Sequence, residues 1–579
     1  MKRQRKVIAW VGLAVLVCCL TACTDLLTDS ADTGDVRTAA GTATVILNGD
    51  EATAIGEGVT IDGQVITIIA PGSYTFRGEL ADGRIVVDVG DNDDVTLVLD
   101  NAEIECSTFS PIYVANADSV VILLEDGTTN YVEDGTSYNL DAGEDEPDAA
   151  IFSHDDLTIT GGGSLTVIAN YDDGIRSKDD LLIESGDITV IAANDGLKGR
   201  DSITVRDADI EIEAGGDGLQ SNNDEDTSKG VVVVESGTIN VQADGDGIQA
   251  ETSLIINGGE LSLITGGGST HSVGSTSAKG LKAGSSLTID GGTMNIDSSD
   301  DAIHSNDTLV INDGEIVISS GDDGIHADTS LAINAGDITI HKSYEGIESM
   351  DLSLNGGTIR VVASDDGING AGGNDGSALD GRPGQNLFNE SADCTMIIRG
   401  GYIYVDAIGD GLDINGPITM TGGTVVLHAP TDDRDGALDW TESFDISGGY
   451  LIAAGSFGMT TQAPGSTSSQ NSVLVNLDSS VSAGTLIHIE DEDGGSVVTF
   501  EPSKTWQSFL LSTASLESGE TYNVYAGGSA TGTNTDGLYS GGTYNSGTSV
   551  GSFTISSAVT VLGLQGGTTF PPPPGDGRW

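Results

Sequence analysis

The chain has 579 residues, of which 89 are Asp or Glu and only 22 are Lys or Arg, so its formal net charge at pH 7 is −67. A charge this negative repels nucleic acid and anionic membrane surfaces, which excludes both as natural binding partners and favours divalent cations. High charge with 5% aromatic residues also occurs in disordered proteins, but here 37% of the residues are hydrophobic and alternate regularly with polar ones. The composition therefore favours a folded β protein.

The first 23 residues have the pattern of a bacterial export signal. A basic segment, residues 2–6, precedes an apolar run, residues 7–20, that is too short to span a membrane comfortably as a helix. The sequence Leu20-Thr-Ala-Cys23 resembles a lipobox, in which the cysteine is lipid-modified. We therefore expect a lipoprotein signal peptide and a lipid anchor on Cys23 that holds the protein at the cell surface or facing the periplasm. An ordinary signal peptide with a coincidental cysteine is the alternative.

Composition divides the rest of the chain into five segments. Residues 24–40 are polar and aperiodic, as expected of a tether. Residues 41–145 contain short alternating runs and predict N-terminal β coils or a β cap, while residues 146–455 contain a repeat. In residues 456–565 the period is lost but β-like runs continue, which predicts a C-terminal β cap, and residues 566–579 are predicted to be a disordered tail.

A motif of about 22 residues recurs through the middle segment. Its anchor is Asp-Gly-Ile or Asp-Gly-Leu, beginning at Asp173, Asp195, Asp217, Asp246, Asp323, Asp366 and Asp410. The patterns Leu-x-Ile-x-x-Gly and x-Ile-x-Val-x-Ala follow, so each repeat holds three short strands with alternate apolar residues. Because the turns recur at the same offsets, we predict an all-β solenoid, a parallel β-helix in which like strands of successive coils pair.

A column of glycines marks the second corner of each repeat. We expect positive φ there, because glycine adopts it at little energetic cost and the column suggests no chemistry. The column consists of Gly186, Gly237, Gly259, Gly292, Gly314, Gly336, Gly357, Gly401, Gly423 and Gly449.

Stacked coils would place the anchor carboxylates in one column, about 5 Å apart. Two such carboxylates repel by about 3 kcal/mol at an effective dielectric constant of about 20, so the column needs backbone hydrogen bonds, protonation or bound cations. Where a coil has a single Asp, an ordinary turn is the simpler interpretation, with the carboxylate bonded to its own backbone. Basic residues near the column are expected to neutralise part of its charge: Arg176, Lys198, Lys279 and Lys282.

Doubled acids leave one carboxylate beyond the one that a turn uses. Those outside the densest region are secondary metal candidates: Asp172, Asp173, Asp300, Asp301, Asp322 and Asp323. Three consecutive repeats further on have acids on both sides of the glycine, and calcium, which takes about six to eight oxygen ligands, is the cation that this pattern predicts. Its predicted ligands are Glu345, Glu348, Asp365, Asp366, Asn369, Asp410, Asp413 and Asn415.

Two histidines and two aromatic residues lie near the same corner. His304 and His326 are one repeat apart, but without a third clear ligand we expect exposed surface residues rather than a transition-metal site. Tyr344 and Trp440 are candidates for contact with a sugar ring, with core or surface packing as the alternative. The sequence contains no Ser/His/Asp, zinc or phosphate-loop signature, so we predict no catalytic residues.

Several motifs together resemble the bacterial carbohydrate-binding β-helix lipoproteins, a family similar in fold to family nine pectate lyases. They are Tyr344-Glu-Gly-Ile-Glu348, Ser364-Asp-Asp-Gly-Ile-Asn369, Gly409-Asp-Gly-Leu-Asp-Ile-Asn-Gly416, Met420-Thr-Gly-Gly-Thr424, Asp94-Val-Thr-Leu-Val-Leu-Asp-Asn-Ala-Glu103 and Ser110-Pro-Ile-Tyr113. The resemblance implies a right-handed parallel β-helix, bound calcium, and binding of a cell-wall polysaccharide such as polygalacturonate or cellulose.

The charge of the chain helps to choose among glycans. Neutral cellulose is usually gripped by aromatic platforms, which are few here, whereas a polyuronate would be repelled unless calcium bridged its carboxylates to the acidic column. We therefore expect a binding protein for an acidic, pectin-like plant or microbial polysaccharide. A calcium-dependent lyase is the enzymatic alternative, but residues 345–415 have no Lys or Arg within their Asp-Gly corners to act as the base. A calcium-stabilised surface adhesin or structural protein is the third possibility.

Overall fold

The computed structural model describes residues 41–272, 276–371, 394–431, 434–458, 462–545 and 547–564. Within these ranges the chain contains strands and turns but no α-helix, and 47 strands join one mixed sheet, which confirms the all-β class. Accordingly, no helix of these residues is long and apolar enough to cross a membrane. The predicted signal peptide with Cys23, the tether and the C-terminal tail lie outside the described residues.

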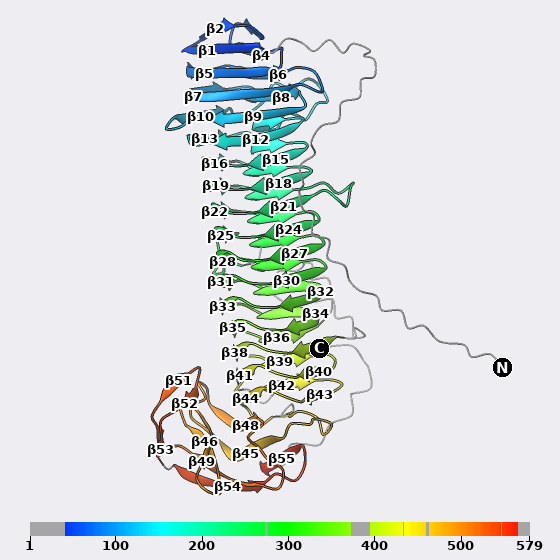
Figure 1. Cartoon of the computed structure of the whole chain (residues 1–579), viewed down its shortest axis with the longest axis vertical. Helices are drawn as coiled ribbons and strands as arrows, with labels where there is room; N and C mark the ends of the chain where they lie inside the picture. The colour runs from blue at the N-terminus through cyan, green and yellow to red at the C-terminus, as the bar shows by residue number, and fades with distance from the viewer. Residues whose placement is uncertain are drawn as a thin grey trace, which may run out of the picture. The chain divides into compact units, whose positions relative to one another are not determined.

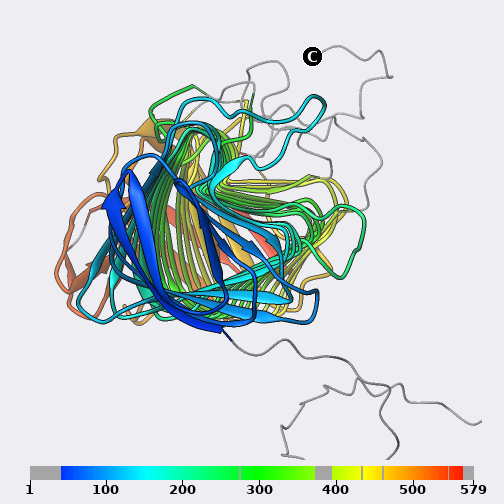
Figure 2. The ribbon, with the colours of Figure 1, turned by 90° about the horizontal axis from the view of Figure 1, so that it is seen from above.

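Each repeat of the middle segment forms one coil of three strands. In one coil these are β14 (Asp173–Ser177), β15 (Asp180–Ile183) and β16 (Gly186–Ala192). They pair in parallel with β17 (Leu197–Gly199), β18 (Ser202–Val205) and β19 (Ala208–Ala214) of the next coil. Figure 1 shows the coils stacked one upon another, and Figure 2, seen from above, shows the strands of successive coils overlying one another. The result is three parallel ladders that run along the stack.

The corner ladder, which carries the Asp-Gly motif, continues in both directions from β14 and β17. Its other strands are β6 (Arg84–Asp88), β8 (Ile112–Asn116), β11 (Ala149–Ser153), β20 (Leu219–Ser221), β23 (Ile248–Ala250), β26 (Leu281–Ala283), β29 (Ile303–Ser305), β32 (Ile325–Ile333), β34 (Ile347–Leu354), β36 (Ile368–Gly370), β39 (Leu412–Ile414) and β42 (Leu438–Trp440).

The middle ladder contains β15 and β18, and the long strands β32 and β34 pass from the corner ladder into it. Its other strands are β9 (Ser119–Leu124), β12 (Asp156–Gly161), β21 (Val231–Val234), β24 (Ser253–Ile256), β27 (Ser286–Ile289), β30 (Thr308–Ile311), β37 (Thr395–Ile398), β40 (Ile418–Met420) and β43 (Phe444–Ile446).

The third ladder contains β16 and β19 and follows the positive-φ glycines. Its other strands are β10 (Thr129–Asp134), β13 (Ser164–Ala169), β22 (Thr238–Ala243), β25 (Glu260–Thr265), β28 (Thr293–Ser298), β31 (Glu315–Ser320), β33 (Asp337–Lys342), β35 (Thr358–Ala363), β38 (Tyr402–Ala407), β41 (Thr424–His428) and β44 (Tyr450–Gly455).

The core fills the inside of the coils with stacked aliphatic side chains. Side chains of a strand alternate between its two faces, so in β19 every second residue is buried and the residues between them are exposed. In register, the same position of each coil contributes one buried residue, as Leu281, Ile303 and Ile325 do, each with no exposed surface. All ten glycines of the second corner have positive φ, between 82° and 126°, which confirms the prediction for that column.

Different arrangements close the two ends of the stack. At the N-terminal end, the first strand of the stack pairs in parallel with the next coil and antiparallel with a hairpin partner. At the C-terminal end, a strand runs antiparallel to β44 and ends the parallel pairing of the third ladder. An outward strand edge could pair with another molecule, so both arrangements protect the stack.

The strands at the N-terminal end, apart from those of the ladders, are β1 (Gly41–Gly49), β2 (Glu51–Gly56), β3 (Val59–Asp62), β4 (Val65–Ile68), β5 (Gly72–Leu80) and β7 (Asp94–Cys106). Those of the C-terminal region are β45 (Ser472–Val481), β46 (Ile487–Asp491), β47 (Ser496–Phe500), β48 (Trp506–Ser512), β49 (Thr521–Ala526), β50 (Ser529–Ala530), β51 (Thr533–Thr535), β52 (Leu538–Ser540), β53 (Tyr544–Asn545), β54 (Thr548–Thr554) and β55 (Val559–Gly563). Six of them form a separate antiparallel sheet, in the order β51-β52-β47-β46-β49-β54.

Removing one aliphatic side chain from the core should destabilise the protein far more than removing one from the surface. Ile303→Ala leaves a cavity at a fully buried position, and we expect a loss of about 2–5 kcal/mol. Ile191→Ala changes a strand residue that is 41% exposed and should alter stability by about 0.5 kcal/mol or less. Chemical denaturation followed by circular dichroism measures both, and equal effects would contradict the assignment of the core.

Candidate functional site

The acids of the Asp-Gly corners are joined along the stack by hydrogen bonds. The backbone N–H of Asp195 donates to Oδ1 of Asp173 in the preceding coil, at 3.1 Å. The same contact recurs from Asp217 to Asp195 (2.8 Å), Asp246 to Asp217 (2.7 Å), Lys279 to Asp246 (2.7 Å), Asp323 to Asp301 (3.0 Å), Glu345 to Asp323 (3.3 Å) and Asp410 to Asp366 (2.6 Å). The expectation that these carboxylates bond their own turn was therefore wrong, because they accept from the next coil.

This contact leaves the second carboxylate oxygen of each corner acid available for another partner. The residue three positions after the acid lies in the corner ladder, so these residues form a column of their own, which we call the partner column. In order along the stack it is Arg176, Lys198, Gln220, Gln249, Lys282, His304, His326, Glu348, Asn369, Asp413 and Asp439. Its chemistry changes from cationic to acidic from the N-terminal to the C-terminal coils.

In the first coils the partner column neutralises the corner acids. Nζ of Lys198 lies 2.6 Å from Oδ2 of Asp195 and 3.4 Å from Oδ2 of Asp173. Nζ of Lys282 lies 2.8 Å from Oδ2 of Asp246. These contacts confirm that basic side chains offset part of the charge of the column, and they occupy Asp173, one of the secondary metal candidates.

Lys279 takes the place of an acid in the column and supplies a buried cation. Its side chain is 1% exposed, and its ammonium group pairs with Asp301 and lies 3.2 Å from Oδ1 of Asp300. Burial alone would raise the pKa of Asp301, but Lys279 and His304 outweigh burial and hold that pKa well below its ordinary range. One oxygen each of Asp300, Asp301 and Asp322 lie within 4.8 Å of one another. In this group of secondary candidates, the lysine provides the positive charge.

The two histidines are buried, so the prediction of exposed surface residues was wrong. His304 and His326 are 2% and 1% exposed, and their rings stack with centroids 5.0 Å apart. Parallel pairing of β29 with β32 aligns the two residues, which is why they stack. Nδ1 of His326 lies 3.2 Å from Oδ2 of Asp323 and 3.8 Å from Oε2 of Glu348. Burial lowers the pKa of His326, but hydrogen bonds to Asp323 and Asp328 outweigh burial and raise that pKa well above the ordinary value, which favours the positively charged imidazolium beside these acids.

In the last acidic group, no Lys, Arg or His among the described residues plays this part. One oxygen each of Asp410, Asp413 and Asp439 lie within 4.8 Å of one another, and Asp413 and Asp439 are register neighbours in β39 and β42. Among the described residues, no ion pair joins these three to Lys, Arg or His. Asp366 and Asp435 add further negative charge nearby. Carboxylates at this spacing need either protons or a hard cation.

The protonation equilibria of the group reflect this crowding. Burial, and then the charges of Asp413, Glu345 and Asp410, raise the pKa of Asp366 to about 9. Burial raises the pKa of Asp410 to about 8, and burial with the charge of Asp439 raises that of Asp413 to about 7. Asp173 and Asp217 also reach about 7. Raised pKa values therefore do not distinguish the last group, whereas the lack of a paired basic side chain among the described residues does.

The predicted calcium ligands are only partly brought together. Asp410 and Asp413 lie in the last group, and Asp366, one coil earlier, accepts the backbone N–H of Asp410. Glu345 and Glu348 hydrogen bond to each other in the coil before that of Asp366. Nδ2 of Asn369 donates to Oε2 of Glu345 at 2.6 Å, and its buried Oδ1 has no hydrogen-bond partner among the described residues. Register places Asn369 directly beside Asp413. Asp365 contacts Tyr344, and Asn415 is exposed after β39.

Sequence reasoning missed Asp439. It follows Leu438 as Asp413 follows Leu412, so its place in the partner column is visible in the sequence once register is assigned. The departure Asp435-Gly-Ala-Leu438 from the motif shifts the corner by one residue: Gly436, not Asp435, donates its N–H to Asp410. When the repeats are aligned on their Asp-Gly pairs, Asp439 falls one position away from Asp413, so the equivalence of these two residues is not visible.

The two aromatic candidates differ in position. Tyr344 is half-buried, and burial and its hydrogen bond to Asp365 raise its pKa, so it lies beside the acidic corner. Trp440 lies in register with Ile414, a fully buried residue, and packs against the core. The alternative of core packing is therefore favoured for Trp440.

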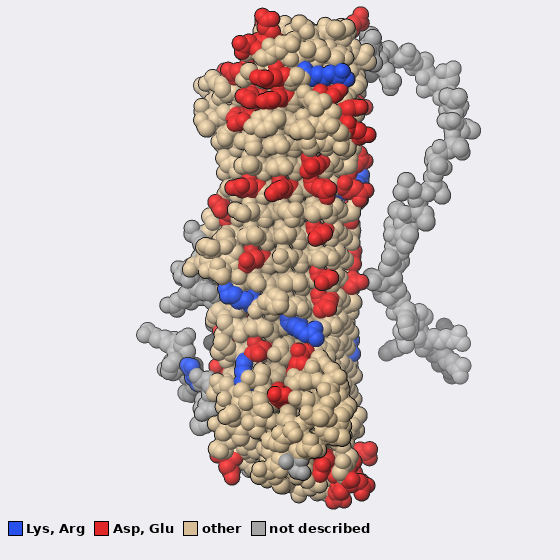
Figure 3. All heavy atoms as spheres, turned by 90° about the vertical axis from the view of Figure 1, so that its left-hand side faces the viewer, with Lys and Arg blue, Asp and Glu red and all other residues tan. Residues whose placement is uncertain are grey.

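Acids also lie on the face of the third ladder, which Figure 3 shows. In β19 the exposed residues Asp209, Glu211 and Glu213 alternate with buried ones. Water and salt screen exposed charges, so these acids need no bound cation. The buried acids of the corner ladder are the ones that require compensation.

The chain is similar to a protein family, to a relative and to a solved structure. Residues 62–324 match a family described as "Carbohydrate-binding domain-containing protein". A protein of that name from Acetivibrio thermocellus is 40% identical over 162 residues, which are 28% of this chain and 55% of the relative, so the chain spans about half the length of that relative. A solved structure described as the polysaccharide lyase-like protein from C. thermocellum, a gadolinium derivative, aligns at 33% identity with a TM-score of 0.38, over 47% of this chain and 96% of that one. The matched segment ends before the last acidic group.

Loss of the buried lysine should destabilise the protein strongly. Lys279→Met leaves Asp300 and Asp301 buried without their ammonium partner, and we expect a loss of about 3–5 kcal/mol. Lys178→Met is the matched control, since Lys178 pairs with Glu146 at a site where the two side chains are 33% and 23% exposed, and its loss should amount to about 1 kcal/mol or less. Denaturant titration of both variants measures the difference. Equal stability of the two would show that Lys279 does not neutralise the group.

Proposed function

We propose that this protein binds an acidic cell-wall polysaccharide through calcium held at the last acidic group, as a lipoprotein anchored outside the cytoplasm. The proposal rests on one observation: Asp410, Asp413 and Asp439 converge with no basic side chain of the described residues paired to them, whereas the other two acidic groups contain Lys279 or His326. We further propose that the coils wind as a right-handed parallel β-helix, because nearly all parallel strand crossovers have that hand.

The donor set suits a hard divalent cation. Calcium accepts carboxylate and amide oxygens at about 2.3–2.6 Å, in numbers of about six to eight. Asp410, Asp413 and Asp439 would supply three carboxylates, and Asp366 lies one coil away. The unpartnered Oδ1 of Asn369 is a neutral oxygen beside Asp413. With no sulfur and no imidazole in the set, calcium is favoured over zinc or copper.

Electrostatics explain why an acidic polysaccharide would bind through calcium. A polyuronate and a chain of net charge −67 repel each other, so their association needs a cation that both can coordinate. Calcium held by two or three protein carboxylates keeps coordination positions for sugar carboxylates and water. The family match over residues 62–324 supports carbohydrate as the partner, and acidity is the further step that the electrostatic argument adds.

Two other functions make different predictions. A calcium-dependent lyase needs a base near the metal, and the partner column from Glu348 onward contains only Glu, Asn and Asp. Arg434 is the basic residue nearest in sequence to the group, and it has contacts of its own. An adhesin or structural protein would use calcium for stability and bind no glycan.

Calcium-dependent glycan binding should be lost when the last group loses charge. Asp413→Asn with Asp439→Asn removes two anionic ligands, and we expect calcium affinity and calcium-dependent retention on polygalacturonate to fall by at least about tenfold. Asp187→Asn, an exposed acid of the third ladder, is the matched control and should change neither. Isothermal titration with calcium, and affinity electrophoresis in polygalacturonate with and without a chelator, measure both quantities.

The same samples separate the alternatives. Ultraviolet absorbance from an unsaturated uronate product would establish a lyase and refute the binding-only function. Stabilisation by calcium without retention on any glycan would favour the adhesin. Retention that persists unchanged in chelator would contradict the role of calcium.

A further inference from the structure

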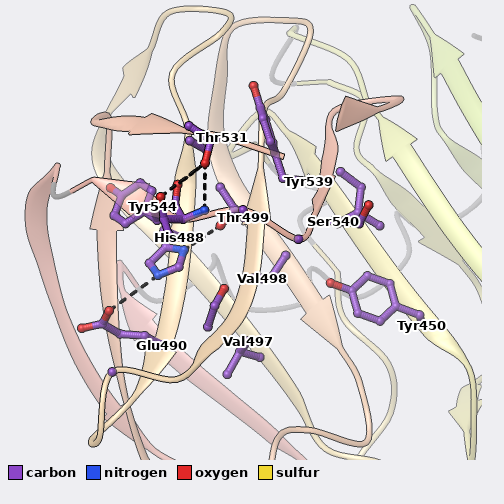
Figure 4. A pocket seen from close by; sticks show the side chains of 17 residues that line it. Tyr450, His488, Glu490, Val497, Val498, Thr499, Thr531, Tyr539, Ser540 and Tyr544 are labelled. Carbon is purple, nitrogen blue, oxygen red and sulfur yellow. Dashed lines mark hydrogen bonds and ion pairs between the residues drawn. The ribbon is translucent and has the colours of Figure 1, made fainter. Parts of the chain in front are cut away.

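A cavity lies in the C-terminal region, away from the corner ladder. It has a volume of about 700 Å³ and is lined by residues of β44, β46, β47, β50, β52 and β53 and of neighbouring turns. Figure 4 shows its side chains. Small-molecule sites commonly have volumes of about 300–1,000 Å³, so the cavity is large enough for a ligand. It lies outside the segment that matches the carbohydrate-binding family.

Three tyrosines line the cavity, and hydrogen bonds hold two of them in place. Tyr539 donates from Oη to Glu501 at 2.7 Å, and Tyr544 donates to the carbonyl of Gly527 at 2.8 Å. The ring of Tyr544 stacks on His488 with centroids 3.9 Å apart and planes 14° from parallel. Fixed rings offer a flat apolar surface without further loss of side-chain entropy on binding.

The hydroxyl of Tyr450 is available to a ligand. Tyr450 is half-buried in β44, and Figure 4 shows its Oη turned toward the other labelled side chains of the cavity. Among the described residues, its Oη makes no hydrogen bond. Because this hydroxyl is partly shielded from water, a hydrogen bond from it to a ligand would contribute to the free energy of binding.

The remaining polar groups suit an uncharged ligand. The one carboxylate in the wall, Glu490, accepts from Tyr525 at 2.9 Å and lies 3.6 Å from Nε2 of His488. Nδ1 of His488 is 2.7 Å from Oγ1 of Thr499, and exposed hydroxyls such as Thr531 and Ser540 line the rim. No Lys or Arg is among the described residues that line the cavity, so an anionic sugar has no charged partner. Because Glu490 is already hydrogen-bonded, a cationic ligand gains less from it than from a free carboxylate.

We propose that this cavity binds a neutral sugar unit of a glycan without a metal ion. A pyranose ring has an apolar face of C–H groups and a rim of hydroxyls. The tyrosine rings match the face, while Glu490, Thr499 and the Tyr450 hydroxyl match the rim. The site is independent of the calcium site proposed above, so the protein would hold acidic and neutral stretches of a wall glycan by two different chemistries.

Binding of neutral oligosaccharides in the presence of a chelator tests the site. The full mature chain is titrated calorimetrically with cellohexaose, xylohexaose and mannohexaose, and we expect at least one of them to bind. Ser540→Trp places a bulky ring at the exposed rim and should weaken that binding by at least about tenfold. Ser480→Trp, also exposed and outside the cavity, is the matched control and should not. Tyr450→Phe, which removes only the hydroxyl, should weaken binding by about fivefold.

The outcomes distinguish this site from the calcium site. The variant Asp413→Asn with Asp439→Asn should bind the neutral sugar as the wild type does. No binding of any of the three sugars in chelator would overturn the proposal, as would binding that Ser540→Trp leaves unchanged. Binding of a quaternary ammonium compound such as choline, with none of the three sugars bound, would overturn the proposal and reassign the cavity to a cation.

Discussion

The hydrogen bond from a corner N–H to the acid of the preceding coil is the contact on which the site depends. It fixes each carboxylate at the turn between the third and corner ladders, and coil after coil repeats it. Satisfying the corner N–H groups in this way builds a line of buried acids whose mutual repulsion must be offset. In the earlier coils, Lys198 and Lys282 of the partner column and Lys279 of the corner column offset part of that repulsion.

Along the stack, the side chains next to the corner acids change from basic to acidic. Lys198, Lys282 and the buried Lys279 provide positive charge in the earlier coils, and His326 does so near the middle. From Glu348 onward the partner column becomes acidic. The last coil contains both Asp439 on β42 and Tyr450 on β44, so the acidic group and the C-terminal cavity draw on the same coil. Glycan contacts of both kinds would therefore concentrate at the C-terminal end of the stack.

Much of this architecture could be predicted from sequence because it is periodic. The three strands per repeat and the positive-φ glycines follow from spacing alone, and the all-β class follows from strict alternation. The burial of His304 and His326 could not be predicted from spacing within one strand. These side chains are covered by residues of adjacent coils, such as the stacked ring of the other histidine. Asp439 was missed because Gly436, and not Asp435, takes the position of the corner acid in that coil and donates its N–H to Asp410. The cavity is assembled from antiparallel strands that have no repeat, so no periodic signal marks it.

The central claim is that a cation binds where the acids lack a built-in one, and crystallography in the presence of calcium tests it most directly. Anomalous scattering from crystals of the mature protein grown with calcium should place an ion in contact with the carboxylates of Asp410, Asp413 and Asp439, and none at Asp300 and Asp301, where Lys279 lies. The account would be contradicted by an ion at the Lys279 group, or by the absence of any ion at Asp410, Asp413 and Asp439 at millimolar calcium.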